Sequence, residues 1–257
     1  MSYTEEQIRK FAAEYTKVNQ GLQELMLQTV VAGQESGDAG VKEHLLYGAA
    51  RRLNLLKRCL ENIFNEFPLN ASKPLHRDVV YDVQINLHAY VMSLSGIFDN
   101  WAWSFVYRHN LLPDVGGKHG VGLFRESTSK YLPKPLRDYL ASKTITNWYE
   151  KYLKSYRDAL AHRIPLYIPP AEFTDEEEKR YNDLENKKME LIKAMEWEKL
   201  DELYEEQENI GTPSFMFLHS FEGEPSRPVL FHPQMLCDGL AIVEFGTLYM
   251  KHWNERA

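Results

Sequence analysis

Apolar side chains recur every three or four residues along most of this chain, and this spacing predicts amphipathic helices. Thr4 followed by Gln7 matches a capping box, so the first helix is expected to run from about Thr4 to Val31. The same spacing predicts four more helices, at about 41–67, 77–109, 135–162 and 233–254. The stretch 77–109 is apolar almost all round, as expected of a helix in the middle of a bundle.

The remaining segments depart from this pattern. Residues 111–132 hold four glycines and Pro113, which predict a surface loop. A long charged helix is expected at 174–209, because its start carries acidic residues and Gly211 follows its end. Alternating apolar residues between positions 213 and 233, on both sides of Glu222–Glu224, predict one β-hairpin.

These elements predict a mainly α protein, an up-and-down helical bundle with a long acidic helix and one small β-hairpin. A chain of 257 residues is long enough to bury one full core, so we expect a single domain over 1–257. The core is expected to comprise about 41–165 together with the last helix, 233–254. Residues 172–232, which carry the acidic helix and the hairpin, are expected to form an insertion.

Net charge bears on the class of partner. The chain has 30 Lys and Arg against 37 Asp and Glu, a net charge of −7, which by itself disfavours a polyanionic partner. However, residues 172–208 hold 15 acidic and six basic residues, so this segment alone carries a net charge of −9. The rest of the chain is near neutral, at +2, and can hold a local basic cleft. Most acidic runs of this kind are solvated helix faces.

The chain has two cysteines, Cys59 and Cys237, inside apolar helical patterns, as is typical of a protein from the reducing cytoplasm. No window approaches 18 uncharged apolar residues, and the first residues lack the apolar core of a signal peptide, so we expect a cytoplasmic protein without membrane spans. No cluster of Cys, His or carboxylates has the spacing of metal ligands. We therefore expect no metal and no cofactor.

The candidate chemistry lies in the run Tyr156–Arg163, where Arg157 and His162 form the pattern R-x4-H. The bare pattern is weak, since about one match is expected by chance in a chain of this composition. A second match, Arg227 to His232, spans the predicted hairpin and is interpreted as coincidence. On a continuous helix Arg157 and His162 point about 140° apart, so a single copy does not bring them together. A symmetric dimer would present the same patch from both sides.

At this point the sequence resembles the HEPN superfamily. The resemblance rests on R-x4-H with the polar Asp158 directly after Arg157, on the run Ala-Leu-Ala-His-Arg at a helix end, and on the predicted helical bundle. The motif itself covers seven or eight residues. The helical architecture extends the resemblance loosely over about residues 41–165. The resemblance implies a HEPN-like helical domain and a metal-independent endoribonuclease, found in toxins and antiviral defence, that acts as a homodimer with the motif at an interfacial cleft. Other members have the fold without the activity.

Each motif residue has a chemical role in such a reaction. Histidine exchanges a proton near neutral pH, so His162 is the candidate acid or base, and the planar fork of Arg157 matches a phosphate. Asp158 is four residues from His162 and is a candidate to orient its ring. Arg163 and Lys154 are candidates to hold neighbouring phosphates. The glycine-rich loop adds Lys118 and His119 as candidate RNA contacts.

Two simpler interpretations stay open. Arg157 and Asp158 can be ordinary surface ion pairs, with His162 placed at a helix end where a cation complements the dipole. Alternatively, the chain is a non-catalytic helical module for dimerisation or protein interaction, and its partner is a protein or antitoxin instead of RNA. Within 77–109, Gln84, His88, Ser95 and Asp99 fall on one line and are expected to make buried hydrogen bonds between helices.

Overall fold

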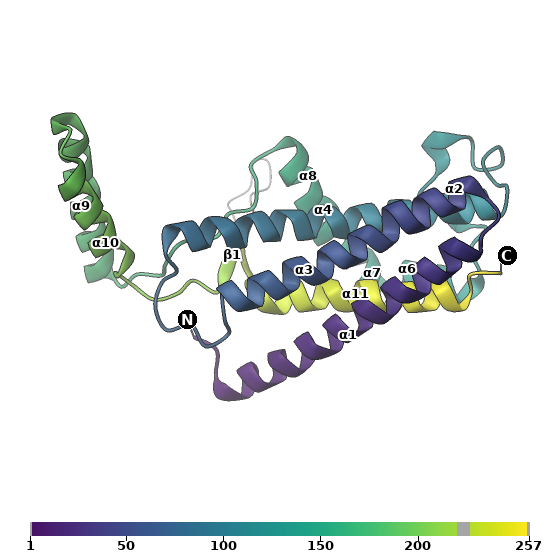
Figure 1. The fold of residues 1–257 in the computed structure, drawn as a ribbon, viewed down its shortest axis with the longest axis horizontal. Coiled ribbons are helices and arrows are strands. Elements are labelled where there is room, and N and C mark those ends of the chain that lie inside the picture. The colour runs from purple at the N-terminus through teal and green to yellow at the C-terminus, as the bar shows by residue number, and fades with distance from the viewer. Residues whose placement is uncertain (1, 220–226, 256–257) are drawn as a thin grey trace.

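The computed structural model describes residues 2–219 and 227–255. It confirms a mainly α bundle with one small β-hairpin, in which the long helices run side by side (Figure 1). The four longest bundle helices are α1 (Glu5–Glu35), α3 (Ala50–Glu66), α4 (Arg77–Arg108) and α11 (Phe231–Lys251). Helix α3 packs on α4, and α1 packs on both α3 and α11. No helix among the described residues is long and apolar enough to cross a membrane.

The main core lies between these four helices and includes the first one. Helix α4 is buried along most of its length and contributes the large side chains of Tyr90, Trp101 and Phe105. The expected core, 41–165 with 233–254, omitted α1, yet its Val18, Leu22 and Leu25 are at most 1% exposed. Helix α1 is therefore an integral part of the bundle. A glycine of α11, Gly246, allows this close packing, since a Cβ there would lie 2.3 Å from a methyl of Leu25.

The helix expected at 41–67 forms, with a change of pitch. It begins as α2 (Ala39–Lys42), widens into the π-helical segment η1 (Glu43–Ala49) and continues as α3. Asp38 caps it, accepting a hydrogen bond from the backbone N–H of Val41 at 2.8 Å. The last helix also forms, but it begins at Phe231, two residues before Pro233.

The stretch expected as one helix at 135–162 is divided. It consists of α6 (Lys134–Ala141), α7 (Lys143–Trp148), the π-helical segment η3 (Tyr149–Leu153) and α8 (Lys154–His162). Ser142 separates the first two, with extended backbone and a side chain that accepts from the N–H of Ile145. This competition between a serine side chain and the helix backbone is the physical reason for the break. The preceding loop holds two short elements, η2 (Lys118–Gly120) and α5 (Glu126–Ser129).

The prediction of one long acidic helix at 174–209 is wrong. The structure has two helices, α9 (Asp175–Ala194) and α10 (Trp197–Glu208), and Met195 between them adopts a left-handed conformation with φ 56°. The helices fold back on each other and project from one end of the bundle (Figure 1). Folding back lets the apolar stripes of the two helices cover each other, in a small core that contains Leu184, Leu203 and Ile210.

The predicted β-hairpin is confirmed in its strands. Strand β1 (Met216–His219) pairs antiparallel with β2 (Arg227–Leu230), with Phe217 opposite Val229. The expected turn at Glu222–Glu224 lies outside the described residues. Phe215 and Phe217 belong to the main core, so this part of 172–232 packs on the bundle, unlike the projecting helices α9 and α10.

Candidate functional site

Helix α8, which carries the R-x4-H motif, packs on α4 through Tyr156 and Ala159. On a regular helix Tyr149, Tyr152, Leu153, Tyr156 and Leu160 would lie along one side and form a single buried stripe. Leu153 and Tyr156 are buried, but Tyr152 is 38% exposed. Tyr152 lies in the π-helical segment η3, whose wider turns change the angle between successive side chains. The advance of about 100° per residue of a regular α-helix therefore does not hold there.

Arg157 lies in a cluster of charges that the sequence did not predict. Asp99 of α4 is desolvated by the surrounding protein, which raises its pKa, while the positive charges of Arg157, Arg52 and Arg125 act to lower it. These three arginines come from α8, from α3 and from the residue before α5. Three guanidinium groups from different parts of the chain thus act electrostatically on one carboxylate, which is itself exposed, in a molecule whose net charge is negative.

Asp158 pairs with the neighbouring arginine. Its Oδ1 lies 3.1 Å from Nη1 of Arg157, and both side chains are partly exposed. No contact among the described residues joins Asp158 to His162, the ring it was expected to orient. In this single chain Asp158 therefore holds the guanidinium of Arg157 beside it, which is the ion pair that the simpler interpretation anticipated.

His162 is exposed in the last turn of α8, and no hydrogen bond or ion pair links it to another described residue. It follows Arg157 by five residues, so the two side chains leave the helix about 140° apart with a rise of about 7.5 Å. Lys154 and Arg163 are exposed as well. One copy of the chain therefore displays the cationic candidates on the surface of α8 without bringing Arg157 and His162 together.

The glycine-rich loop is connected to the cluster through Arg125. The guanidinium of Arg125 donates a hydrogen bond to the backbone oxygen of His119, while its charge acts on Asp99. Lys118 and His119 are both exposed. The structure thus places this loop beside Arg125, one of the three arginines whose charges act on Asp99.

A polar network extends the cluster along α4. Nε of Arg52 donates to Oδ1 of Asn100 at 3.1 Å, and Nδ2 of Asn100 lies 3.3 Å from Nδ1 of His44. Gly48 and Gly96 make room for it, because a Cβ at either position would lie within 2.4 Å of the side chain of Asn100 or Arg52, respectively. Two glycines inside helices are a sequence signal of close packing at these positions. The side chains that pack against them, Asn100 and Arg52, become evident only in the structure.

Strand β1 brings a further histidine against α8. Nε2 of His219 lies 2.8 Å from Oγ of Ser155, and its ring packs edge-on against Tyr156. Burial, together with the smaller effect of the charges of Arg163 and Arg227, lowers the pKa of His219 to about 4. His219 is therefore neutral at pH 7 and helps to position α8.

Of the four polar residues of α4 expected to make buried hydrogen bonds, His88 and Gln84 have structural roles, whereas Asp99 is exposed. His88 and Gln84 of α4 hydrogen-bond the backbone of Leu166 and Ile168, in the extended segment after α8, at 2.9 and 3.3 Å. These bonds are made to a loop instead of a second helix. His232, from the discounted second match, is fully buried and lies 2.7 Å from the backbone oxygen of Phe67.

Two features mark the limits of the site. Within residues 2–219 and 227–255, no group of three or more His, Cys, Asp or Glu is placed to hold a metal ion.

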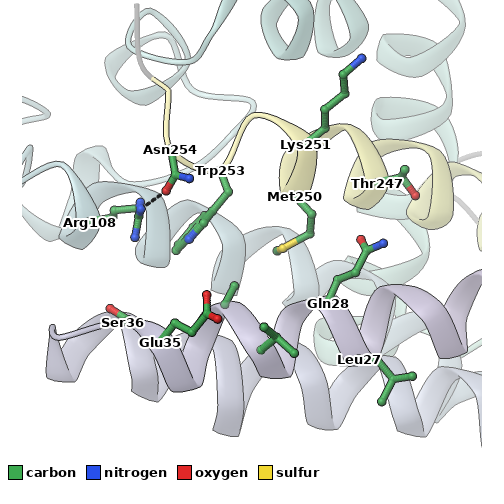
Figure 2. A pocket seen from close by; sticks show the side chains of 12 residues that line it. Leu27, Gln28, Glu35, Ser36, Arg108, Thr247, Met250, Lys251, Trp253 and Asn254 are labelled. Carbon is green, nitrogen blue, oxygen red and sulfur yellow. Dashed lines mark hydrogen bonds between the residues drawn. The ribbon is translucent and has the colours of Figure 1, made fainter.

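A groove of about 710 Å³ lies between the C-terminal parts of α1 and α11 (Figure 2), and it contains none of the motif residues. Its labelled side chains are largely apolar or uncharged, with Arg108 over the ring of Trp253.

Comparison with protein-family models, curated proteins and solved structures finds no match to this chain.

Proposed function

We propose that this protein cleaves RNA without a metal ion, using Arg157 and His162 in a cleft between two copies of the chain. The observation that carries the proposal is the positive charge of Arg157, Arg52 and Arg125 acting on Asp99, with Arg157 on α8, the helix that also exposes His162. Guanidinium groups match the geometry of a phosphodiester, and an exposed histidine is a suitable proton carrier. Lys154, Arg163 and the loop residues Lys118 and His119 extend the cationic surface over neighbouring phosphates.

The reaction assigns one step to each group. His162 of one copy takes the proton of the 2′-hydroxyl, and the 2′-oxygen forms a bond to phosphorus. The bond from phosphorus to the 5′-oxygen breaks, and His162 of the second copy protonates that oxygen. Arg157 stabilises the charge on the non-bridging oxygens, and Asp158 holds the guanidinium in place. The products are a 2′,3′-cyclic phosphate and a 5′-hydroxyl.

The dimer follows from the helix geometry. Because Arg157 and His162 diverge by about 140° on one helix, a second copy is needed to bring another Arg and His to the same phosphate. Ala161 lies between them on the surface of α8 and is exposed, so a second helix can approach closely at this point. We place this activity in the cytoplasm, in a toxin or antiviral defence system, as the resemblance to the HEPN superfamily implies.

Cleavage of purified total RNA in the presence of EDTA tests the proposal. The wild-type protein should cleave, and Arg157→Ala and His162→Ala should each lower the rate by at least about 100-fold, the usual contribution of an acid–base group. Arg180→Ala is the matched control, because it removes an exposed arginine from the projecting helices. Equal cleavage by all three variants would assign the activity to a contaminant.

A specific observation supports one alternative, a protein-interaction module. The α9–α10 hairpin presents Met189 of α9, Met195 of the turn and Trp197 of α10, each more than half exposed. Large apolar side chains at the tip of a projecting hairpin are typical of a protein contact. If the protein binds no RNA and cleaves none, but Trp197→Ala abolishes binding to a co-purifying protein, the interaction module is the better account.

A further inference from the structure

A cavity of about 340 Å³ lies where the α9–α10 hairpin meets the bundle, and its size is within the range of small-molecule sites. Its wall comprises the N-terminal part of α4, the extended segment after α8 and the facing sides of α9 and α10. Aromatic rings make up much of this wall: Tyr81, Tyr167, Phe173, Tyr181 and Tyr204. Flat rings of this kind accept another flat ring by stacking.

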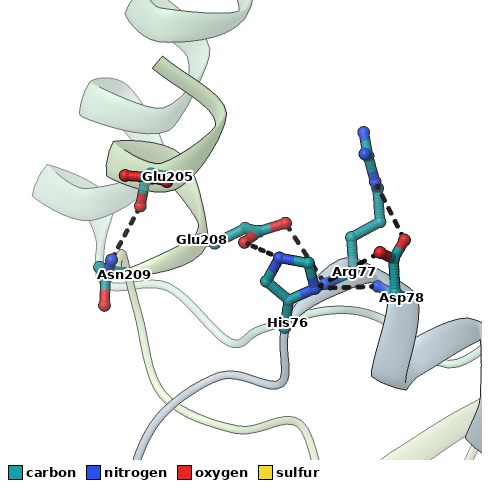
Figure 3. Close-up of polar contacts among 6 residues, drawn as sticks. All are labelled: His76, Arg77, Asp78, Glu205, Glu208 and Asn209. Atoms are coloured by element: carbon teal, nitrogen blue, oxygen red, sulfur yellow. Dashed lines mark hydrogen bonds and ion pairs between the residues drawn. The ribbon is translucent and has the colours of Figure 1, made fainter. Parts of the chain in front are cut away.

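Polar contacts beside the cavity join the end of α10 to the start of α4 (Figure 3). Oε2 of Glu208 lies 3.1 Å from Nε2 of His76, and Oε1 of Glu208 accepts a hydrogen bond from the backbone N–H of Arg77 at 3.3 Å. On the other side, Glu172 and Thr212 exchange two backbone hydrogen bonds, of 2.8 and 3.0 Å. These contacts join α10 to α4 and to the segment before α9, so the walls are preformed.

Two glutamines line the cavity, one from α4 and one from α10. Gln84 of α4 accepts from the backbone N–H of Ile168 through Oε1, and Gln207 of α10 donates through Nε2 to Glu185. Among the described residues, no hydrogen bond uses Nε2 of Gln84 or Oε1 of Gln207. The cavity thus offers one amide donor and one carbonyl acceptor, a combination that complements the mixed edge of a nucleobase.

Two cations lie at one ring of the wall. Cζ of Arg77 is 4.8 Å from the centre of the Tyr204 ring, and Nζ of Lys188 is 4.2 Å from it. Lys188 is almost fully buried and also pairs with Glu185 at 2.9 Å. Arg77 is half exposed and its closest carboxylate oxygen, on Asp78, is 4.0 Å away. Arg77 is therefore the group best placed to receive an anionic part of a ligand at the mouth.

We propose that this cavity binds a nucleotide, with the base among the tyrosines and the phosphate at Arg77. The nucleotide is either a free nucleoside monophosphate or an unpaired residue of an RNA strand, since both present the same ring and phosphate. The RNA strand as the source of the nucleotide rests on the proposed function, which is RNA cleavage. Tyr167 follows His162 by five residues, so at most about 17 Å of chain separates the cavity wall from the proposed cleavage site.

Isothermal titration calorimetry with the full chain tests this site. We expect AMP or a hexa-adenylate RNA to bind, and inorganic phosphate to bind at least about 10-fold more weakly, because stacking supplies most of the affinity. Tyr167→Ala and Tyr81→Ala should each weaken binding by roughly 5- to 150-fold, the loss expected for one stacked base. Tyr167→Phe, which keeps the ring, should bind within about twofold of the wild type.

Tyr47→Ala is the matched control. Tyr47 is 61% exposed, close to the 58% of Tyr81, and it also has an arginine over its ring, Arg51 at 4.8 Å, but it lies in η1, outside the cavity. This variant should bind like the wild type. Absence of binding to both AMP and RNA, binding of phosphate as tight as that of AMP, or an equal loss in Tyr47→Ala would each overturn the proposal.

Experiments can distinguish a failure of the proposed nucleotide site from a failure of the proposed RNA cleavage. His162→Ala leaves the cavity intact, so it should keep its affinity for AMP and RNA while losing cleavage. If AMP binds but no variant affects cleavage of RNA, the cavity stands and the proposed function falls. Binding of AMP as tight as that of the hexamer identifies a free nucleotide as the ligand, and binding of the hexamer alone identifies an RNA strand.

Discussion

Replacing Asp238 with asparagine is expected to change the pH dependence of folding stability. Asp238 of α11 is 3% exposed, and its Oδ1 accepts hydrogen bonds of 2.7 Å from Nε1 of Trp148 and from Nε2 of Gln234. Burial raises the pKa of this carboxyl to about 7, although the two hydrogen bonds act to lower it. The charge of Asp238 also helps to raise the pKa of Tyr156, so it acts on α8, the helix that carries the motif.

The sign and size follow from the two protonation states. An aspartate in an unfolded chain has a pKa near 3.9, so between about pH 4 and pH 7 the folded state holds a proton that the unfolded state has lost. The free energy of unfolding therefore falls as pH rises through this window, by about 4 kcal/mol for a difference of about three pKa units. Above about pH 7 Asp238 is charged in both states, and the free energy of unfolding stays lower by this full amount.

Asparagine keeps the acceptor oxygen and removes the charge. We expect wild type and Asp238→Asn to have similar stabilities near pH 4, and the variant to be more stable at pH 8 by up to about 4 kcal/mol. Urea unfolding followed by tryptophan fluorescence at intervals of one pH unit measures this difference. His232, whose pKa burial lowers to about 4, has the opposite effect on stability, but both proteins contain it and it cancels in the difference. Parallel stability curves for the two proteins would refute the reasoning, and Asp183→Asn, at an exposed position of α9, provides a control.

Three further predictions concern packing and capping. Gly246→Ala places a Cβ 2.3 Å from a leucine methyl of α1 and should lower the free energy of unfolding by about 1–3 kcal/mol in urea, whereas Gly37→Ala, with no atom within 4 Å, should change it by less than about 0.5 kcal/mol. Gly96→Ala places a Cβ 2.4 Å from Cζ of Arg52 and should displace that side chain from its asparagine partner, at a cost of about 1 kcal/mol in the same assay. Thr174→Ala removes the capping box of α9 and should cost about 0.5–2 kcal/mol, detected as faster amide hydrogen exchange in that helix; unchanged exchange would contradict this role.

The sequence predicted those elements whose ends are marked by strong local signals. Thr4 and Gln7 do form a capping box, and the helix before Pro68 ends at Glu66. The break at Met195 had no such signal, because neither glycine nor proline occurs there and a non-glycine residue adopts positive φ. That turn is favoured by the burial of apolar stripes from α9 against α10, which is a tertiary effect.

The candidate site was predicted in its residues but not in its surroundings. The positions of Arg157 and His162 on one helix follow from their spacing, and their divergence by about 140° was expected. The convergence of Arg52 and Arg125 on Asp99 joins residues far apart in the chain, and no local pattern indicates it. Asp158 has two candidate partners on the same helix, Arg157 and His162. Only the structure shows that it contacts Arg157.

The proposed function depends most on the claim that two copies build one cleavage site. Wild-type protein can be mixed with His162→Ala under conditions that exchange subunits, with RNA cleavage in EDTA as the readout. If each cleft needs His162 from both copies, a mixture containing half wild type should retain about a quarter of the activity of the same total concentration of wild type, because random pairing gives that share of intact dimers. Retention of half the activity would show that each copy acts alone and would contradict the proposed site.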